Sequence, residues 1–262
     1  MKTNTKAWIN LGMLILTLGV NFLGGTGRIN NLSQGEVSDM YNTLITPAGF
    51  TFSIWSVIYG LLLISLIVMV IKHDRSYYQD AIESITPLLW VSFIANMIWI
   101  VLFSYLQIGL STVFIFIYLF SLVFILKKLK NLNTHREWLL PLTFGLNTGW
   151  LFIASVVNVS AFLVKIEWTG FGIEESTWAV IMMLIATLLT TFVVLQLRNA
   201  AFPLPIAWAF FGIYQAMGSK GIEGTPQLVA LICLGLLVCL SVFIFIKNNK
   251  GLYPVSDARI NK

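Results

Sequence analysis

The feature that most constrains the fold of this chain is a series of long stretches without a charged residue. No Asp, Glu, Lys or Arg occurs in 84–126, 138–164, 176–197, 199–219 or 224–246. A helix that crosses a bilayer needs about 20 mostly apolar residues, and each stretch supplies them. Charged residues make up only 10% of the chain, against about a quarter of an average soluble domain. The sequence therefore predicts an all-α, polytopic membrane helical bundle.

About eight transmembrane helices are expected. Their predicted spans are 7–23, 48–71, 87–104, 109–127, 138–160, 176–196, 202–218 and 226–246. The apolar runs are continuous, whereas strands of a transmembrane barrel would be short and alternating. Asn10 and Asn21 interrupt the first span, and Pro203 and Pro205 begin the short seventh span. The first span has no A-x-A cleavage pattern, so we interpret it as an uncleaved helix rather than a signal peptide.

The distribution of cationic side chains predicts the orientation. With eight spans, one side receives both termini and thirteen cations, namely Lys2, Lys6, Lys72, Arg75, Lys127, Lys128, Lys130, Arg136, Arg198, Lys247, Lys250, Arg259 and Lys262. The other side receives Arg28, Lys165 and Lys220. Because Lys and Arg concentrate in cytoplasmic segments, we expect a multi-pass cell-membrane protein with both termini in the cytoplasm. The net charge of +5 is explained by this topology, and no nucleic-acid partner is expected.

Patterns typical of catalysis or metal binding are missing from the sequence. Cys233 and Cys239 lie in the last span, six residues apart, and we interpret them as small apolar filler. His73 and His135 fall in predicted cytoplasmic loops, and neither H-x-x-x-H nor C-x-x-C occurs. No ionisable residue lies deep within a predicted span, which argues against proton coupling. We therefore predict no catalytic residue, no metal ligand and no cofactor.

An aromatic block begins the second span. Pro47 precedes an uncharged apolar run, and a proline suits the first turn of a helix. Trp55 and Tyr59 are four residues apart and share a helix face, with Phe52 beside them. The preceding loop, 24–46, has two interpretations, a surface connection or a lid over this aromatic wall.

Three other spans carry polar and aromatic residues on one helix face. The faces consist of Ser92, Asn96, Trp99 and Phe103; of Thr143, Asn147, Ala154 and Asn158 with Trp150 on the flank; and of Trp208, Gly212, Gln215 and Ser219. Amides within hydrocarbon are costly unless they are hydrogen-bonded, so these faces should turn inward. Two interpretations stay open: the amides bond across helices, or they line a shared cavity with the aromatic block.

The spacing of these residues resembles the TspO/MBR family, the tryptophan-rich sensory proteins. The family pattern has a proline, a Trp eight residues later and a Tyr four further on, matched here by Pro47, Trp55 and Tyr59. Asn96, Trp99 and Phe103 match its third helix, and Trp150 and Asn158 match its fifth. The resemblance covers about residues 1–160. It implies a TspO-like five-helix core at 1–162, followed at 163–262 by three additional transmembrane helices and a cytoplasmic tail.

The chain departs from the family pattern at several positions. One proline stands where the family usually has two, and no Trp precedes it in the loop. Gly49 replaces a common aromatic residue and Ser53 a common proline. Lys165 stands where a second Asn would fall in the fifth helix.

The resemblance implies a membrane receptor, sensor or transporter-like protein that binds a hydrophobic small molecule. The implied ligand is a tetrapyrrole such as protoporphyrin or haem, or a sterol-like molecule, in an aromatic pocket open to the outside. Aromatic rings would stack on the ligand, and two Asn amides would hold its polar edge. The residues expected to line the pocket are Pro47, Phe50, Trp55, Tyr59, Asn96, Trp99, Phe103, Trp150 and Asn158.

Two other functions stay open, and so does the oligomeric state. A small-solute permease unrelated to TspO would use interrupted helices, and the predicted span with Pro203 and Pro205 is the best candidate for such a break. A membrane enzyme that degrades tetrapyrroles could use Trp and Tyr as radical relays. Gly145 and Gly149 form a G-x-x-x-G pair that could seat a neighbouring helix of the same chain or a homodimer partner. Beyond the ligand, the bilayer is the expected partner.

Overall fold

The computed structural model describes residues 1–132 and 137–254, and within these ranges every regular element is helical. The elements are α1 (Thr3–Gly25), α2 (Gln34–Met40), the 3₁₀ turn η1 (Gly49–Ser53), α3 (Ile54–Ile71), α4 (Ser76–Ser104), α5 (Ile108–Leu132), α6 (Leu139–Lys165), the 3₁₀ turn η2 (Gly170–Gly172), α7 (Glu175–Leu197), α8 (Pro203–Ser219) and α9 (Thr225–Lys247). The predicted all-α membrane bundle is confirmed.

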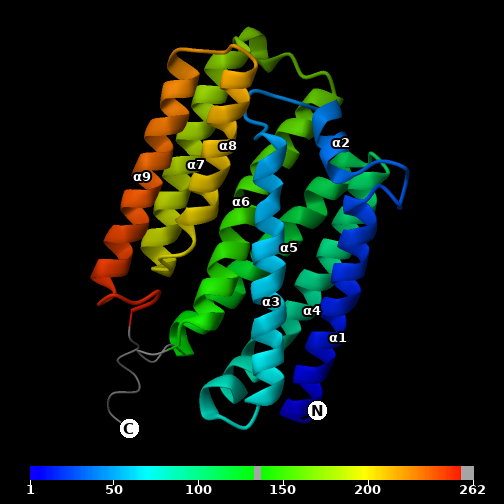
Figure 1. Cartoon of the computed structure of the whole chain (residues 1–262), viewed down its shortest axis with the longest axis vertical. Coiled ribbons are helices and arrows are strands. Elements are labelled where there is room, and N and C mark those ends of the chain that lie inside the picture. Colours follow the sequence, from blue (N-terminus) through cyan, green and yellow to red (C-terminus); the bar gives the residue numbers. More distant parts are fainter. Residues whose placement is uncertain (133–136, 255–262) are drawn as a thin grey trace.

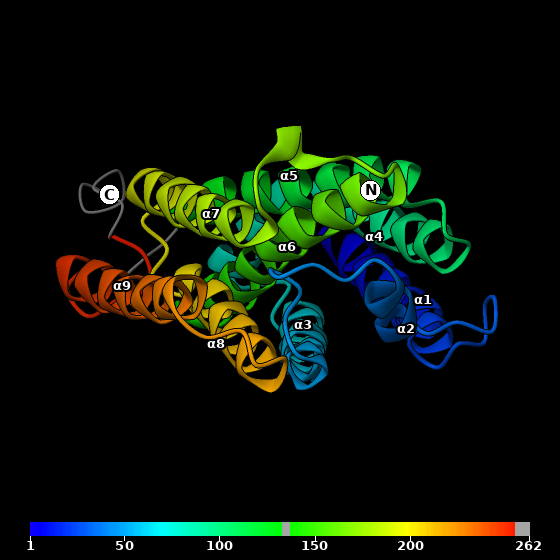
Figure 2. The same cartoon turned by 90° about the horizontal axis from the view of Figure 1, so that it is seen from above.

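The long helices run alternately up and down, so that α1 begins and α9 ends at the same end of the bundle (Figure 1). We call this end the terminal end. Viewed along the bundle, α7, α8 and α9 gather at one side, and α6 contacts α8 as well as α3 and α5 (Figure 2). The contacts α1·α4, α4·α5, α5·α6, α3·α6 and α1·α3 close a five-helix group, onto which α8 packs through α6.

Seven of the eight predicted spans coincide with helices that are long and apolar enough to cross a membrane. The eighth, α8, has 17 residues and would be about 26 Å long at 1.5 Å per residue. The helix runs beside α9 for most of its length (Figure 1). It is continuous from Pro203, and both prolines lie in its first turn. The break that a permease would need is therefore absent from this helix.

Two predicted helix starts are wrong. Pro47 does not lie in the first turn of a helix, because a 3₁₀ turn separates it from α3. The span predicted from residue 87 begins at Ser76 and carries Pro87 in its interior. Tertiary contacts hold its extra turns, since Glu83 pairs with Lys6 and accepts a hydrogen bond from Thr3 Oγ1 at 2.6 Å. A proline inside a membrane helix is tolerated when neighbouring groups satisfy the freed carbonyl.

The cations separate between the two ends as the sequence predicts. Most cations that the sequence places on the same side as the termini lie near helix ends at the terminal end of the bundle. Arg28, Lys165 and Lys220 lie at the opposite end. Arg136, Arg259 and Lys262 lie outside the described residues, as does His135. Figure 1 thus supports the division of the loops between the two ends, from which the orientation was predicted.

The G-x-x-x-G pair of α6 seats the start of α8. A Cβ on Gly145 would lie 2.3 Å from Asn199 Oδ1, and a Cβ on Gly149 would lie 2.1 Å from the Phe202 carbonyl oxygen. Asn199 in turn donates to the Pro141 carbonyl and accepts from the backbone N–H groups of Ala201 and Phe202. The pair therefore serves a contact within the chain, and a homodimer stays a separate expectation.

We predict that Gly149→Ala destabilises the bundle. The added methyl group would overlap a backbone carbonyl that cannot rotate away, and such overpacking costs about 1–3 kcal/mol. Thermal unfolding in dodecyl maltoside micelles measures the effect. Gly12→Ala is the matched control, because no atom lies within 4 Å of its Cβ position. Equal unfolding midpoints for the two variants would contradict this account.

Candidate functional site

Aromatic rings from α3, α4, α6 and η1 meet near the end of the bundle opposite the terminal end. Trp55 and Tyr59 stack with their ring centroids 5.0 Å apart and their planes 13° apart. Trp55 also lies edge-on to Trp150 at 6.0 Å and tilted against Trp99 at 6.3 Å. Phe52 meets Trp150 edge-on at 6.1 Å. These geometries are the ones that aromatic quadrupoles favour, so the rings stabilise one another.

A cavity of about 50 Å³ remains beside these rings. Six of the nine residues predicted from the sequence line it, namely Pro47, Trp55, Trp99, Phe103, Trp150 and Asn158. Gln34, Ser38 and Tyr41, from α2 and the residue after it, also line the cavity. Because a water molecule occupies about 30 Å³ in the liquid, the space in this conformation suits one or two waters. The rings themselves fill most of the predicted pocket.

The other three predicted residues lie elsewhere. Tyr59 and Asn96 belong to a polar group beside the cavity, in which Tyr59 donates to Asn21 Oδ1 at 2.7 Å and Asn21 donates to Asn96 Oδ1 at 2.9 Å. Phe50 is 46% exposed. Its ring packs edge-on against Trp208 and Phe211 of α8, so Phe50 does not lie among the cavity residues.

The buried amides form hydrogen bonds across helices. This agrees with the first of the two interpretations of the polar faces. Asn158 accepts from Trp99 Nε1 at 3.0 Å, and its amide nitrogen donates to Ser111 Oγ at 3.2 Å and Thr112 Oγ1 at 2.7 Å. One side chain of α6 thus ties α4 and α5 together. Its carbonyl oxygen accepts one described hydrogen bond, which leaves one acceptor position for another donor.

The polar face predicted on α8 divides between two environments. Gln215 and Ser219 are exposed, whereas Gly212 packs so closely on η1 that a Cβ there would lie 2.1 Å from Thr51 Oγ1. Ala48 donates to the Gly212 carbonyl at 3.1 Å, and Trp208 Nε1 donates to the Thr51 carbonyl at 2.9 Å. The helix α8 therefore holds η1, and with it Phe52 and the start of α3, in place.

Two buried polar atoms on residues that line the cavity have no hydrogen-bond partner among the described residues. They are Trp150 Nε1 and Gln34 Nε2. Trp150 is 2% exposed, so bulk water does not satisfy its N–H. An unpaired buried donor is unusual and costly, and a molecule with an acceptor in the cavity would remove that cost.

The helix α2, which covers the cavity, is a feature that the sequence analysis missed. A capping box starts it: Glu36 N–H donates to Ser33 Oγ, and Ser33 N–H donates to Glu36 Oε2 at 2.7 Å. The S-x-x-E pattern at 33–36 was the available signal. Hydrogen bonds from Ser33 lower the pKa of the Glu36 carboxyl. The carboxylate half of the cap is therefore complete at neutral pH and weakens as the pH falls through that lowered pKa, whereas the bond from the Glu36 N–H to Ser33 Oγ stays.

No group of three or more His, Cys, Asp or Glu residues that could hold a metal ion is found in residues 1–132 and 137–254. The cavity is instead a mostly apolar, aromatic space with indole and amide donors. Such a lining suits a flat apolar molecule with a few acceptor atoms.

A family model described as TSPO-like protein matches residues 7–246. This match includes residues of all eight long helices and therefore extends beyond residues 1–160, the part of the chain in which the family pattern was found. No curated protein matches the chain, and no solved structure matches it.

We predict that Asn158→Ala destabilises the bundle by about 1–3 kcal/mol, the usual cost of leaving a buried partner unpaired. The variant leaves the Trp99 N–H without its acceptor, whereas Ser111 and Thr112 keep bonds to the Ile108 carbonyl. Thermal unfolding in micelles is the measurement. Ser155→Ala is the matched control, because Ser155 is equally buried and bonds only within its own helix. A loss no larger than that of the control would refute a linking role for Asn158.

Proposed function

The chain belongs to the TSPO-like family, and from this membership we propose that it binds a hydrophobic small molecule in the aromatic cavity. In this proposal the protein works as a membrane sensor or transporter-like protein. The ligand class is a tetrapyrrole such as protoporphyrin or haem, with sterol-like molecules as the second class. The tetrapyrrole assignment rests on the family resemblance of the Trp and Asn pattern.

The observation that carries the proposal is the unpartnered N–H of Trp150. This donor is buried and belongs to a residue that lines the cavity, at a depth where an unsatisfied polar group is costly. A carboxylate or carbonyl oxygen of a ligand would accept its hydrogen bond. The unused acceptor position of Asn158 would take a ligand N–H, and the rings of Trp55 and Trp99 would stack on an apolar face.

The cavity is too small for a tetrapyrrole, so binding requires a change of conformation. At about 50 Å³ it is far below the roughly 300–1,000 Å³ of pockets for drug-sized ligands. We infer that the described conformation is closed, and that a tetrapyrrole enters when α2 and the rings beneath it separate. The helix α2 has only seven residues and lies over the cavity through Gln34, Ser38 and Tyr41, so it is the natural lid.

An enzyme is the second candidate function, favoured by one observation. Trp150, Trp55 and Trp99 form a chain with neighbouring centroids 6.0 and 6.3 Å apart. Adjacent indoles at this separation would suit radical transfer to or from a bound pigment. An enzyme of this kind would alter a tetrapyrrole chemically, whereas a sensor or carrier would release it unchanged.

We predict that purified protein binds protoporphyrin IX saturably and that Trp150→Phe raises the dissociation constant about fivefold. The loss of one hydrogen bond, about 1 kcal/mol, corresponds to that factor. Trp150→Phe also shortens a buried ring that packs against Phe52 and Trp55, so the unfolding midpoint, measured without pigment, is expected to fall modestly. A folded variant with weaker binding then separates the lost donor from lost folding. The measurement is Trp fluorescence quenching with inner-filter correction, read as a dissociation constant rather than an amplitude.

Trp8→Phe is the matched control, because Trp8 is 58% exposed on a helix that does not line the cavity. If Trp150→Phe left the dissociation constant unchanged, the proposed hydrogen bond from the Trp150 N–H to the ligand would be contradicted. Chromatography of the pigment after illumination separates the two functions: an altered pigment favours the enzyme. No saturable binding of protoporphyrin or of a sterol would leave the permease as the better interpretation.

In the same proposal the terminal end faces the cytoplasm of a cell membrane, because it carries most of the cations. We predict opposite labelling of two single cysteines, Asp74→Cys at the terminal end and Glu223→Cys at the opposite end. Both positions are exposed, and Cys233 and Cys239 would first be replaced by Ala. An impermeant maleimide added to intact cells should label only the Glu223 variant, and the Asp74 variant should react only after lysis. The reverse pattern would invert the topology.

A further inference from the structure

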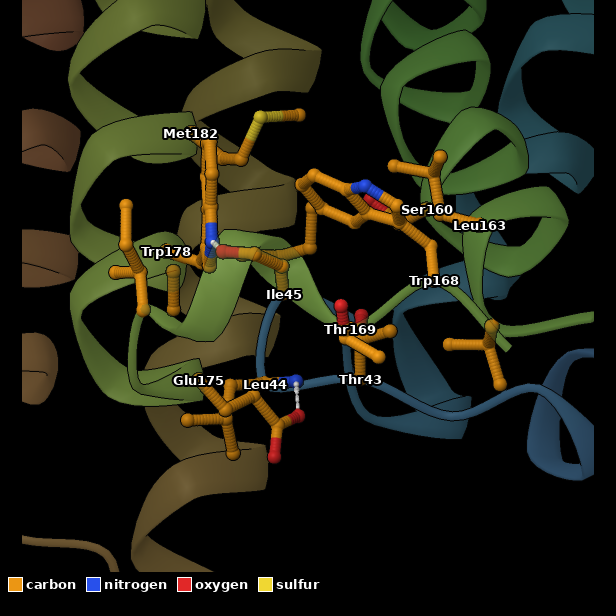
Figure 3. A pocket seen from close by; sticks show the side chains of 14 residues that line it. Thr43, Leu44, Ile45, Ser160, Leu163, Trp168, Thr169, Glu175, Trp178 and Met182 are labelled. Atoms are coloured by element: carbon orange, nitrogen blue, oxygen red, sulfur yellow. Dashed lines mark hydrogen bonds between the residues drawn. The ribbon is translucent and has the colours of Figure 1, made fainter. Parts of the chain in front are cut away.

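A second pocket lies where the end of α6 meets the start of α7 (Figure 3). Its volume is about 280 Å³, several times that of the aromatic cavity. The walls come from the last turns of α6, the loop that contains η2, the first turns of α7 and the segment 43–45. None of the residues predicted from the sequence lines it, so it is a separate site.

The pocket is charged at one end and apolar at the other. Figure 3 places Glu175 at one end, Met182 at the other, and the indoles of Trp168 and Trp178 between them. Glu175 begins α7, and Met182 lies seven residues further along, about 10 Å at 1.5 Å per residue. Leu163 of α6 completes the apolar wall. The pocket therefore runs from the helix end toward the membrane interior, with its polarity falling along the way.

Among the described residues that line the pocket, Glu175 is the only charged one. One of its carboxylate oxygens accepts a hydrogen bond from the Leu44 N–H at 3.2 Å. The other oxygen has no partner among the described residues. The nearby cations bond elsewhere, since Lys165 donates to the Leu106 carbonyl and Lys220 donates to the Asn42 amide oxygen. A cationic ligand would thus complement the charge of the pocket, whereas an anion would not.

The two indoles supply a second kind of attraction for a cation. Their centroids are 5.1 Å apart and their planes are inclined at 58°. Trp178 is held in place by a hydrogen bond from its Nε1 to the Gly170 carbonyl at 2.7 Å. Gly170 has φ +64°, and a Cβ there would lie 2.9 Å from that nitrogen, so the contact requires glycine. Indole faces bind organic cations, quaternary ammonium groups above all.

We propose that this pocket binds a small organic cation with an apolar body. The ammonium group lies beside the Glu175 carboxylate and the indoles, and the apolar part extends toward Met182. The volume equals that of about nine liquid water molecules, which suits a ligand of about ten non-hydrogen atoms. A whole lipid is too large for this space. The proposal is independent of what the aromatic cavity binds.

The test uses benzyltrimethylammonium as the probe and the full chain in dodecyl maltoside micelles. Isothermal titration calorimetry, corrected with empty micelles, should show saturable binding that weakens as NaCl screens the carboxylate. The neutral isostere neopentylbenzene, in which carbon replaces the charged nitrogen, should bind more weakly. No saturable binding of the cation, or equal binding of the isostere, would overturn the proposal.

Substitutions locate the site. Glu175→Gln keeps an acceptor for the Leu44 N–H and removes the charge, so the dissociation constant should rise by up to about fivefold, as for one solvent-exposed ion pair. Trp168→Leu should cost about the same through the lost cation–π contact. Glu174→Gln is the matched control, because Glu174 is next to Glu175 in the sequence but does not line the pocket. Equal losses for Glu174→Gln and Glu175→Gln would indicate a diffuse surface potential and refute the site.

Unfolding midpoints of all variants, measured without the probe, separate lost binding from lost folding. A competition experiment then distinguishes a free molecule from a lipid headgroup. Dihexanoylphosphatidylcholine and dihexanoylphosphatidylglycerol are added below their micellar concentrations. Neither should displace the probe. Displacement by the choline lipid alone would assign the pocket to a headgroup and overturn its assignment to a free cation.

Discussion

The structure depends on one constraint: a polar group at bilayer depth must find its hydrogen-bond partner within the protein. Asn158 meets this constraint by joining α6 to α4 and α5, and Asn21 joins α1 to α3 and α4. Asn10 donates to Thr86 and accepts from Trp90, each at 2.9 Å. The two asparagines that interrupt the first span in the sequence therefore help to attach α1 to the bundle, together with the contacts of Thr3 and Lys6 with Glu83.

The C-terminal helices are attached by close backbone contacts at glycines, whereas the helices of the core are connected by hydrogen bonds of buried amides. Gly145 and Gly149 admit the start of α8, and Gly212 admits η1 against the middle of α8. Because lipid offers no hydrophobic drive to bring helices together, small residues and backbone contacts carry such interfaces. The consequence is functional as well as structural, since α8 supports the turn that carries Phe52 and leads into Trp55.

The two pockets differ in a way that bears on their use. In the aromatic cavity the rings contact each other and leave little space, so a large ligand has to displace ring–ring contacts. The pocket of Glu175, Trp168 and Trp178 is open in the described conformation, and its charge is unpaired. One site thus requires a conformational change and the other does not, which allows the two binding experiments to succeed or fail separately.

The sequence by itself determined the helical membrane fold and most of its spans, whereas the meeting of Trp55, Trp99 and Trp150 was predicted from the family resemblance. Uncharged length and helical spacing are local properties, so they can be read along the chain. Tertiary structure decided the rest. The early start of α4 depends on Glu83 meeting Lys6, and the outward position of Phe50 depends on Trp208 packing against it. The Glu175 pocket joins segments more than a hundred residues apart, and no local pattern encodes which distant side chains will share a space.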